Sequence, residues 1–190
     1  MARERFVEAV TEGILSLPQD MKAVLRIVED PEVDDAGRVL MAGALLHVLS
    51  AHNAIPGQRG ILAHVDDVLV LRLALERVQK TNPVSMARHR EESPELFESA
   101  DSQLEVSREF LGDLMQVLDE AVDGCPKLTH QGHDAKQCAL DEEGSTWLYD
   151  TVQEAIVQEL ELDEDEVARE ARNVDRIVPH LQSRVAAKKA

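Results

Sequence analysis

The chain has 190 residues, of which 44% are hydrophobic and only 3% aromatic, and its formal net charge is −17. This hydrophobic content is enough for a core built from aliphatic side chains, and it excludes a disordered chain. The charge argues against nucleic acid and anionic membranes as partners, because both repel a negatively charged protein surface.

The charge is unevenly distributed along the chain. Residues 1–90 carry a net charge of −1, residues 91–166 carry −20, and residues 167–190 carry +4. This pattern predicts an acidic surface over the later part of the chain, which either solvates the protein or docks a basic protein partner. The basic end can fold back onto this acidic surface.

Hydrophobic side chains recur at helical spacing through almost the whole chain, whereas the alternation typical of strands is scarce. The first two predicted helices cover residues 3–16 and 19–29, and Pro18 separates them because proline removes a helical hydrogen bond. Asp30 and Pro31 then predict a helix start, with the acid as N-cap and the proline in the first turn.

Two strongly hydrophobic helices follow at about residues 32–51 and 61–79, with a turn at residues 53–60 between them. The first of these helices is hydrophobic nearly all round, which is typical of a buried helix. Together the two helices predict a central helical hairpin at about residues 32–79.

The polar segment after this hairpin carries Pro83 and Pro94 and predicts a linker at residues 82–93. The linker separates a helical domain at residues 1–81 from an acidic helical region at residues 94–190, which packs on that domain or beside it. The fold class expected from the whole pattern is an all-α bundle of about six or seven helices.

The acidic region begins with a predicted long helix at about residues 94–123. Residues 125–144 are expected to be irregular or short-helical, and Ser145 to cap the next helix. A last helix at about residues 163–187 has acids at its start and bases at its end, as the helix dipole favours, and Pro179 should kink or split it.

The turn of the central hairpin carries a recognisable pattern: a serine, an Ile-Pro pair, and two adjacent acids that open the second hydrophobic helix. The residues that form it are Ser50, Ile55, Pro56, Asp66 and Asp67. Over about residues 42–78 this pattern resembles the YkvA-like family of small helical bacterial proteins, a domain of unknown function. The family usually has proline where this chain has Ala51 and aspartate where it has Asn53. The resemblance implies a helical fold and no particular activity.

The polar residues of this turn have a structural and a functional interpretation. As structural residues, Asp66 and Asp67 accept unpaired backbone N–H groups at the start of the helix, and Asn53 stabilises the turn. The functional alternative is a metal or ligand site, in which Asn53, His64, Asp66 and Asp67 converge at the loop that contains Pro56. The neutral Asn53 lowers the local negative charge, which weakens a site for a hard cation.

His47 lies on the buried first helix of the hairpin, and we expect it to be a hydrogen-bonded core histidine. A metal-assisted hydrolase would need His47, His64, Asp66 and Asp67 to converge. The sequence contains no glycine-rich phosphate loop, Gly-x-Ser-x-Gly elbow or His-Glu-x-x-His pair. An enzyme is therefore the less favoured interpretation.

A second candidate metal site consists of Cys125, His130, His133 and Cys138, spaced Cys-x4-His-x2-His-x4-Cys. Two thiolates and two imidazoles are suitable ligands for tetrahedral zinc. The segment lacks the paired Cys-x2-Cys of common zinc motifs, so the alternative is two buried thiols and two surface histidines. The sequence predicts no cofactor, and zinc at this segment is the alternative.

The function that these patterns favour is a non-catalytic helical interaction or regulatory module, which binds a protein partner with a basic or an apolar surface, or self-associates. The alternative is a metal-binding protein, with zinc at Cys125–Cys138 or a cation at Asp66 and Asp67. Two cysteines and an N-terminus without an apolar leader predict a cytoplasmic protein with reduced thiols. The hydrophobic stretches are too short and too polar for stable membrane insertion.

Overall fold

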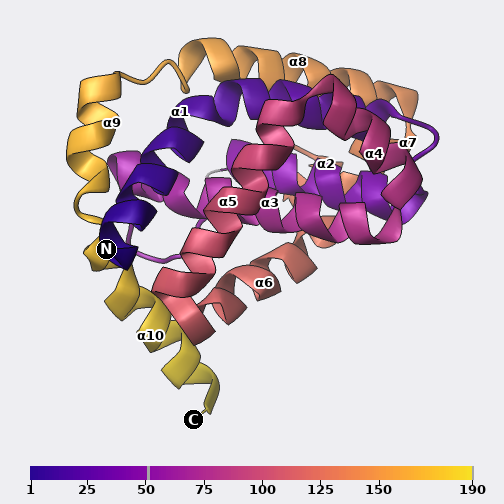
Figure 1. Cartoon of the computed structure of the whole chain (residues 1–190). Helices are drawn as coiled ribbons and strands as arrows, with labels where there is room; N and C mark the ends of the chain where they lie inside the picture. Colours follow the sequence, from indigo (N-terminus) through magenta and orange to yellow (C-terminus); the bar gives the residue numbers. More distant parts are fainter. Residues whose placement is uncertain (51, 190) are drawn as a thin grey trace.

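A computed structural model describes residues 1–50 and 52–189, and these are folded almost entirely into helices (Figure 1). The α-helices are α1 (Ala2–Glu29), α2 (Asp35–Leu49), α3 (His64–Thr81), α4 (Pro83–Glu92), α5 (Pro94–Leu111), α6 (Met115–Gly124), α7 (Ala135–Leu140), α8 (Glu142–Gln158), α9 (Glu164–Ala171) and α10 (Ile177–Lys189). The 3-10 turns are η1 (Gly60–Ala63), η2 (Gly112–Leu114), η3 (Cys125–Lys127) and η4 (Val174–Arg176). The all-α prediction is confirmed, with more helices than expected. Ala51, a predicted helical residue and one of the departures from the family pattern, lies outside the described residues.

The predicted central hairpin is formed by α2 and α3, which pack against each other in the middle of the bundle (Figure 1). Every residue from Met41 to His47 in α2 and from Val65 to Leu75 in α3 is buried. Helices that are hydrophobic all round need cover on several sides, and α1, α5, α6, α7 and α8 provide it.

The acidic region shares its core with the N-terminal half. One continuous cluster of buried hydrophobic side chains extends from Phe6 in α1 to Leu181 in α10. Within it, α1 packs along α5, and α2 packs on α7 and η3. Of the two predicted arrangements, the structure therefore shows the acidic region packed on the hairpin rather than beside it.

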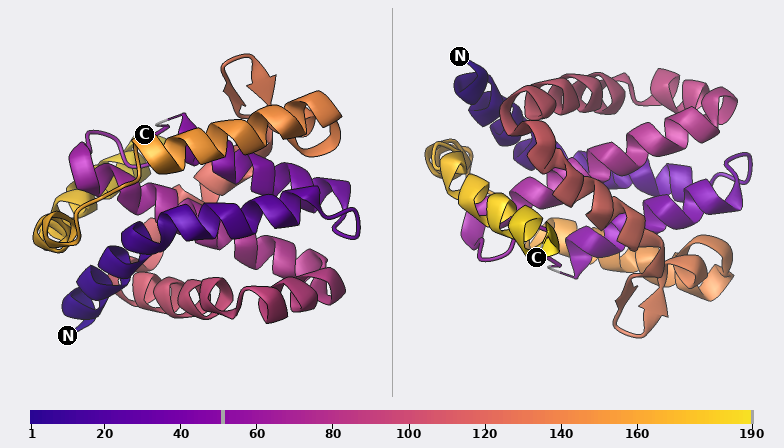
Figure 2. Two further views of the ribbon diagram at one scale, coloured as in Figure 1. Left: turned by 90° about the horizontal axis from the view of Figure 1, so that it is seen from above. Right: turned by 90° about the horizontal axis from the view of Figure 1, so that it is seen from below.

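The prediction that Pro18 separates two helices is wrong, because α1 continues through it. Buried side chains lie on both sides of the proline, including Leu17 and Met21, so core packing holds the helix together despite the lost hydrogen bond. The helix changes direction along its length (Figure 2), as a helix with an internal proline is expected to do.

Asp30 and Pro31 do not start a helix, which corrects another prediction. Asp30 is the C-cap of α1, and its side chain accepts the backbone N–H of Glu32 at 2.9 Å. The next helix, α2, is capped instead by Asp34, whose carboxylate accepts the backbone N–H of Gly37 at 2.7 Å. Both aspartates are good cap residues, and the turn between them decides which one starts the helix.

Residues 82–93 are not an irregular linker, because they form α4. Pro83 and Pro94 each occupy the first position of a helix, where a missing N–H costs nothing. Met86 and His89 of α4 are buried against the bundle. The prolines therefore mark two helix starts and not a domain boundary.

The long helix predicted for residues 94–123 is interrupted at η2, where Gly112 has a φ of +53°. This left-handed conformation suits glycine and ends α5 before α6 begins. The two helices consequently run in different directions (Figure 1). Sequence periodicity continues across the break and could not reveal it.

Residues 125–144 contain η3, a short hairpin of β1 (Thr129–His130) and β2 (His133–Asp134), and α7. The next helix, α8, starts at Glu142 and not at the predicted Ser145. The last predicted helix is split into α9 and α10 by η4. Pro179 lies in the first turn of α10, so the split comes just before the proline.

The predicted acidic surface is confirmed. Every acid between residues 91 and 166 is exposed except Asp119 and Asp134. Lys188 of α10 forms an ion pair with Glu120 of α6, so the basic end does fold back onto an acidic helix. Within the described residues, none of the helices combines the length and the hydrophobicity that crossing a membrane requires.

Candidate functional site

The central hairpin brings polar side chains from its two helices together inside the protein. His47 lies in the last turn of α2, and Asp66 and Asp67 lie in the first turn of α3. A helical hairpin places the end of its first helix next to the start of its second, so residues 19 positions apart meet. His47 is fully buried, and Asp66 and Asp67 are only 1% and 5% exposed.

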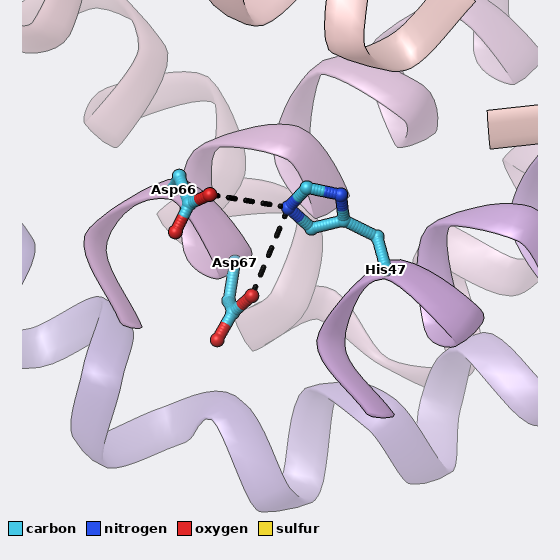
Figure 3. Close-up of side chains that lie close together, drawn as sticks. All are labelled: His47, Asp66 and Asp67. Carbon is cyan, nitrogen blue, oxygen red and sulfur yellow. Dashed lines mark hydrogen bonds and ion pairs between the residues drawn. The ribbon is translucent and has the colours of Figure 1, made fainter. Parts of the chain in front are cut away.

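The three side chains point toward one another (Figure 3). The Nε2 atom of His47 is 3.3 Å from Oδ2 of Asp66 and 3.8 Å from Oδ1 of Asp67. One potential ligand atom from each residue lies within 4.8 Å of the others, which is close enough for a single metal ion to bind all three. In the part of the chain that the structure describes, this is the one such group found among histidine, cysteine, aspartate and glutamate.

Groups around the cluster hold the two carboxylates in place. The backbone N–H of Ala54, in the loop after α2, donates to Oδ2 of Asp66. Oδ2 of Asp67 forms a hydrogen bond with Nδ1 of His64, with 3.1 Å between the two atoms. The side chain of His64 is 23% exposed, so it links the buried cluster to the surface.

The cluster carries little positive charge to balance its acids. Among the described residues, no lysine or arginine forms an ion pair with Asp66 or Asp67, and their charged partners are the histidines His47 and His64. Burial, together with the neighbouring Asp66 carboxylate, raises the pKa of Asp67 to about 6, although the hydrogen bond to His64 opposes the shift. Nδ1 of His47 is buried and has no hydrogen-bond partner among the residues that the structure describes. Two buried carboxylates in this situation are costly unless a cation compensates them.

Some of the predicted turn residues join the buried cluster and others do not. Asp66 and His64 take part in the cluster with Asp67, and His47 is the hydrogen-bonded buried histidine that the sequence predicted. Asn53 and Pro56 are exposed and do not join it. The structural interpretation also holds for Asp66, which does accept a backbone N–H, although the donor is Ala54 of the loop and not the first turn of α3 itself.

The Cys125–Cys138 segment does not assemble a zinc site in the described structure, because its cysteines and histidines form no common ligand group. Both thiols are free and buried, and burial raises the pKa of Cys125 to about 12 and that of Cys138 to about 11, which opposes the thiolate that zinc needs. The ring of His133 instead stacks on Trp147, with 4.1 Å between the ring centroids. The buried thiols match the alternative interpretation, whereas the two histidines are half-buried and not on the surface as that alternative predicted.

Comparison with known proteins identifies no relative of this chain. No protein-family model matches the sequence, and no curated protein or solved structure matches it significantly. The resemblance of residues 42–78 to the YkvA-like family therefore stays a prediction, and the chemistry of the site rests on its geometry.

Proposed function

We propose that this protein binds a divalent cation at His47, Asp66 and Asp67, which we call the cation site. The observation that carries the proposal is the convergence of two buried carboxylates and an imidazole, with no lysine or arginine of the described residues paired to the two acids. A doubly charged ion would neutralise both acids and replace the water that burial has removed from them.

The donor set favours a first-row transition ion such as Zn²⁺, Mn²⁺ or Co²⁺. Imidazole nitrogen suits these ions, whereas Ca²⁺ takes six to eight oxygen ligands and Mg²⁺ keeps much of its water. The hydrogen bonds that Ala54 and His64 make to the two carboxylates support this choice, since carboxylate ligands of metals are usually held by such contacts.

The burial of the site favours a structural or sensing ion over a catalytic one. A metal-assisted hydrolase needs an open coordination position that a substrate can reach, and the three side chains that form the site are between 1% and 8% exposed. An ion here would join the end of α2 to the start of α3 and stabilise the hairpin on which the other helices pack.

The proposal is tested by titrating chelator-treated protein with Zn²⁺ or Co²⁺ in a calorimeter and by following thermal unfolding. We expect one equivalent to bind, and free metal at a hundred times Kd to stabilise the fold by about 2.7 kcal/mol. The variants Asp66→Asn and His47→Gln should lose both effects.

A matched control separates this site from adventitious binding. The double variant His130→Asn/His133→Asn removes the two histidines of the β1–β2 hairpin, which lie outside the cation site, and should bind like the wild type. Equal binding by wild type and Asp66→Asn, or loss of binding in the His130/His133 variant, would contradict the cation site.

A second candidate function rests on the acids of residues 91–166, all of which are exposed except Asp119 and Asp134. We propose that this acidic surface docks a protein partner with a basic face, as the composition of the chain suggests. In α9, replacement of Glu164, Asp165 and Glu166 by their amides should weaken capture of that partner, and rising salt should do the same. Capture that is insensitive to salt would argue against docking through charge.

A further inference from the structure

The cation site lies beneath the surface, and an ion can exchange there only if part of the structure opens. The side chains of His47 and Asp66 are each 1% exposed, and that of Asp67 is 8% exposed. A usable metal site needs a path from solvent. The ion would therefore enter where the neighbouring element that opens most easily lies.

The loop between α2 and η1 lies directly against the cation site. Ala54 of this loop donates its backbone N–H to Asp66. The ring of His52 packs edge-on against the ring of His47, with 5.6 Å between their centroids. Because the loop contacts two of the three ligands, its movement would uncover the cation site.

Helix α10 in turn lies over this loop (Figure 2). Gly57 of the loop meets the ring of His180, since a Cβ added at Gly57 would lie 3.0 Å from Cε1 of that histidine. Further along α10, Arg184 lines a cavity of about 240 Å³ together with His52, Asn53 and Ala54. The loop therefore lies between the cation site and α10.

The attachment of α10 to the bundle is weak. Only Ile177 and Leu181 of this helix are buried, and most residues beyond Leu181 are exposed. Near its end, the surface ion pair of Lys188 with Glu120 ties it to α6. An element with few buried contacts opens at a lower free energy than the core does.

We propose that α10 is a cover for the cation site, and that opening of α10 together with residues 52–57 sets the rate at which the ion enters and leaves. The inference rests on the proposed function for its ligand, and on the contacts of His180 and Arg184 for its mechanism. Because the cover contacts the loop and not the ion, it should change the rates of exchange and leave the equilibrium affinity unaltered.

The first test needs no metal. Hydrogen exchange of the Ala54 amide, measured on the full chain in chelator, reports opening of the loop over Asp66. Lys188→Glu places two acids together and should speed this exchange about 2–5-fold, in line with the strength of a surface ion pair. The charge swap Glu120→Lys/Lys188→Glu should restore the wild-type rate, and Leu181→Ala should speed exchange further.

The matched control is Arg5→Glu, which breaks the similarly exposed pair of Arg5 with Glu109 on α1 and α5, and it should not affect Ala54. If hydrogen exchange at Ala54 were unchanged in both Lys188→Glu and Leu181→Ala, the proposal that α10 covers the cation site would be wrong, whether or not the protein binds metal.

The second test measures the rates at which Co²⁺ binds and is removed by excess chelator. In Lys188→Glu both rate constants should rise by the same factor, while Kd stays within about twofold. Unchanged rate constants, or a change in only one of them and hence in Kd, would contradict the proposal that α10 covers the cation site. If Lys188→Glu sped hydrogen exchange at Ala54 but the protein bound no Co²⁺, the proposal that α10 acts as a cover would be supported and the proposed function refuted. The two proposals can therefore fail separately.

Discussion

Gly43 in α2 lies against the backbone of Cys125, so closely that a Cβ at position 43 would be 2.1 Å from the carbonyl oxygen of Cys125. Close packing of α2 on η3 thus depends on a glycine in the middle of a buried helix. The carbonyl group cannot rotate away as a flexible side chain would, and one of the two segments must move if a side chain is introduced.

Gly43→Ala should therefore destabilise the protein by about 2 kcal/mol or more, because overpacking outweighs the better helix propensity of alanine. Urea unfolding followed by circular dichroism measures the effect. Gly124→Ala is the control, since a Cβ at Gly124 meets no atom within 4 Å. Gly124→Ala should be as stable as the wild type or slightly more stable. If Gly43→Ala were as stable as the wild type, α2 and η3 would not be so tightly packed.

A second prediction concerns the buried ion pair of Arg72 and Asp20, which joins α3 to α1 with 2.5 Å between Nη2 and Oδ2. Asp20→Ala would leave the fully buried guanidinium without its carboxylate and should cost about 3–5 kcal/mol of unfolding free energy.

Arg5→Ala, at a surface ion pair, should cost no more than about 1 kcal/mol in the same denaturation experiment. The double variant Asp20→Leu/Arg72→Met should be more stable than Asp20→Ala, because it removes both charges. A loss below about 1 kcal/mol in Asp20→Ala would contradict burial of this pair.

A third prediction follows from the raised pKa of Asp67, which is about 6 in the folded protein against an ordinary value of 3.8. The folded state holds the proton more tightly than the unfolded state does, so this group opposes folding above pH 6 and ceases to do so below about pH 4. In chelator, Asp67→Asn should therefore be more stable than the wild type at pH 7.5, by up to about 3 kcal/mol.

The advantage of Asp67→Asn should shrink as the pH falls from 6 to 4, and urea unfolding at a series of pH values measures it. With saturating Zn²⁺ the order should reverse, because the variant has lost a ligand. Lower stability of Asp67→Asn at pH 7.5 in chelator would show that the charge of Asp67 is already compensated without metal.

A fourth prediction concerns the two cysteines. With pKa values of about 12 and about 11, the thiols of Cys125 and Cys138 hold almost no thiolate at pH 8. Both should react with a disulfide reagent at least about 100-fold more slowly than free cysteine does, and both should react fully in urea. A thiol that reacts rapidly in the folded protein would contradict their burial.

Much of the architecture was predictable because helical periodicity is a local signal. The hydrophobic runs in α2 and α3 identified the central hairpin, and charge counts identified the exposed acids. Some predictions failed because proline is compatible with more than one local structure. Pro18 lies inside a helix that core packing stabilises, whereas Pro83 and Pro94 start helices in a segment predicted to be a linker. The break at Gly112 depends on a backbone conformation that the sequence does not reveal.

The candidate site was predictable only in part. Asp66, Asp67 and His64 were identified as residues that could meet, and His47 was expected to be buried. Asn53 was included because it lies in the same turn, but it faces the surface. The cysteines and histidines of residues 125–138 are close in sequence, yet a β-hairpin and a helix keep them from forming a common site.

The sequence by itself determined the all-α fold class, the central hairpin and where the charge lies, because these properties depend on the order and type of neighbouring residues. Only the tertiary structure decided which polar groups meet. The side chain of His47 is 3.3 Å from that of Asp66 because two helices pack at a particular angle and register. The same packing leaves histidines as the charged partners of Asp67, with no lysine or arginine among the described residues in an ion pair with it. Such pairings depend on the packing of the whole bundle, which no local pattern encodes.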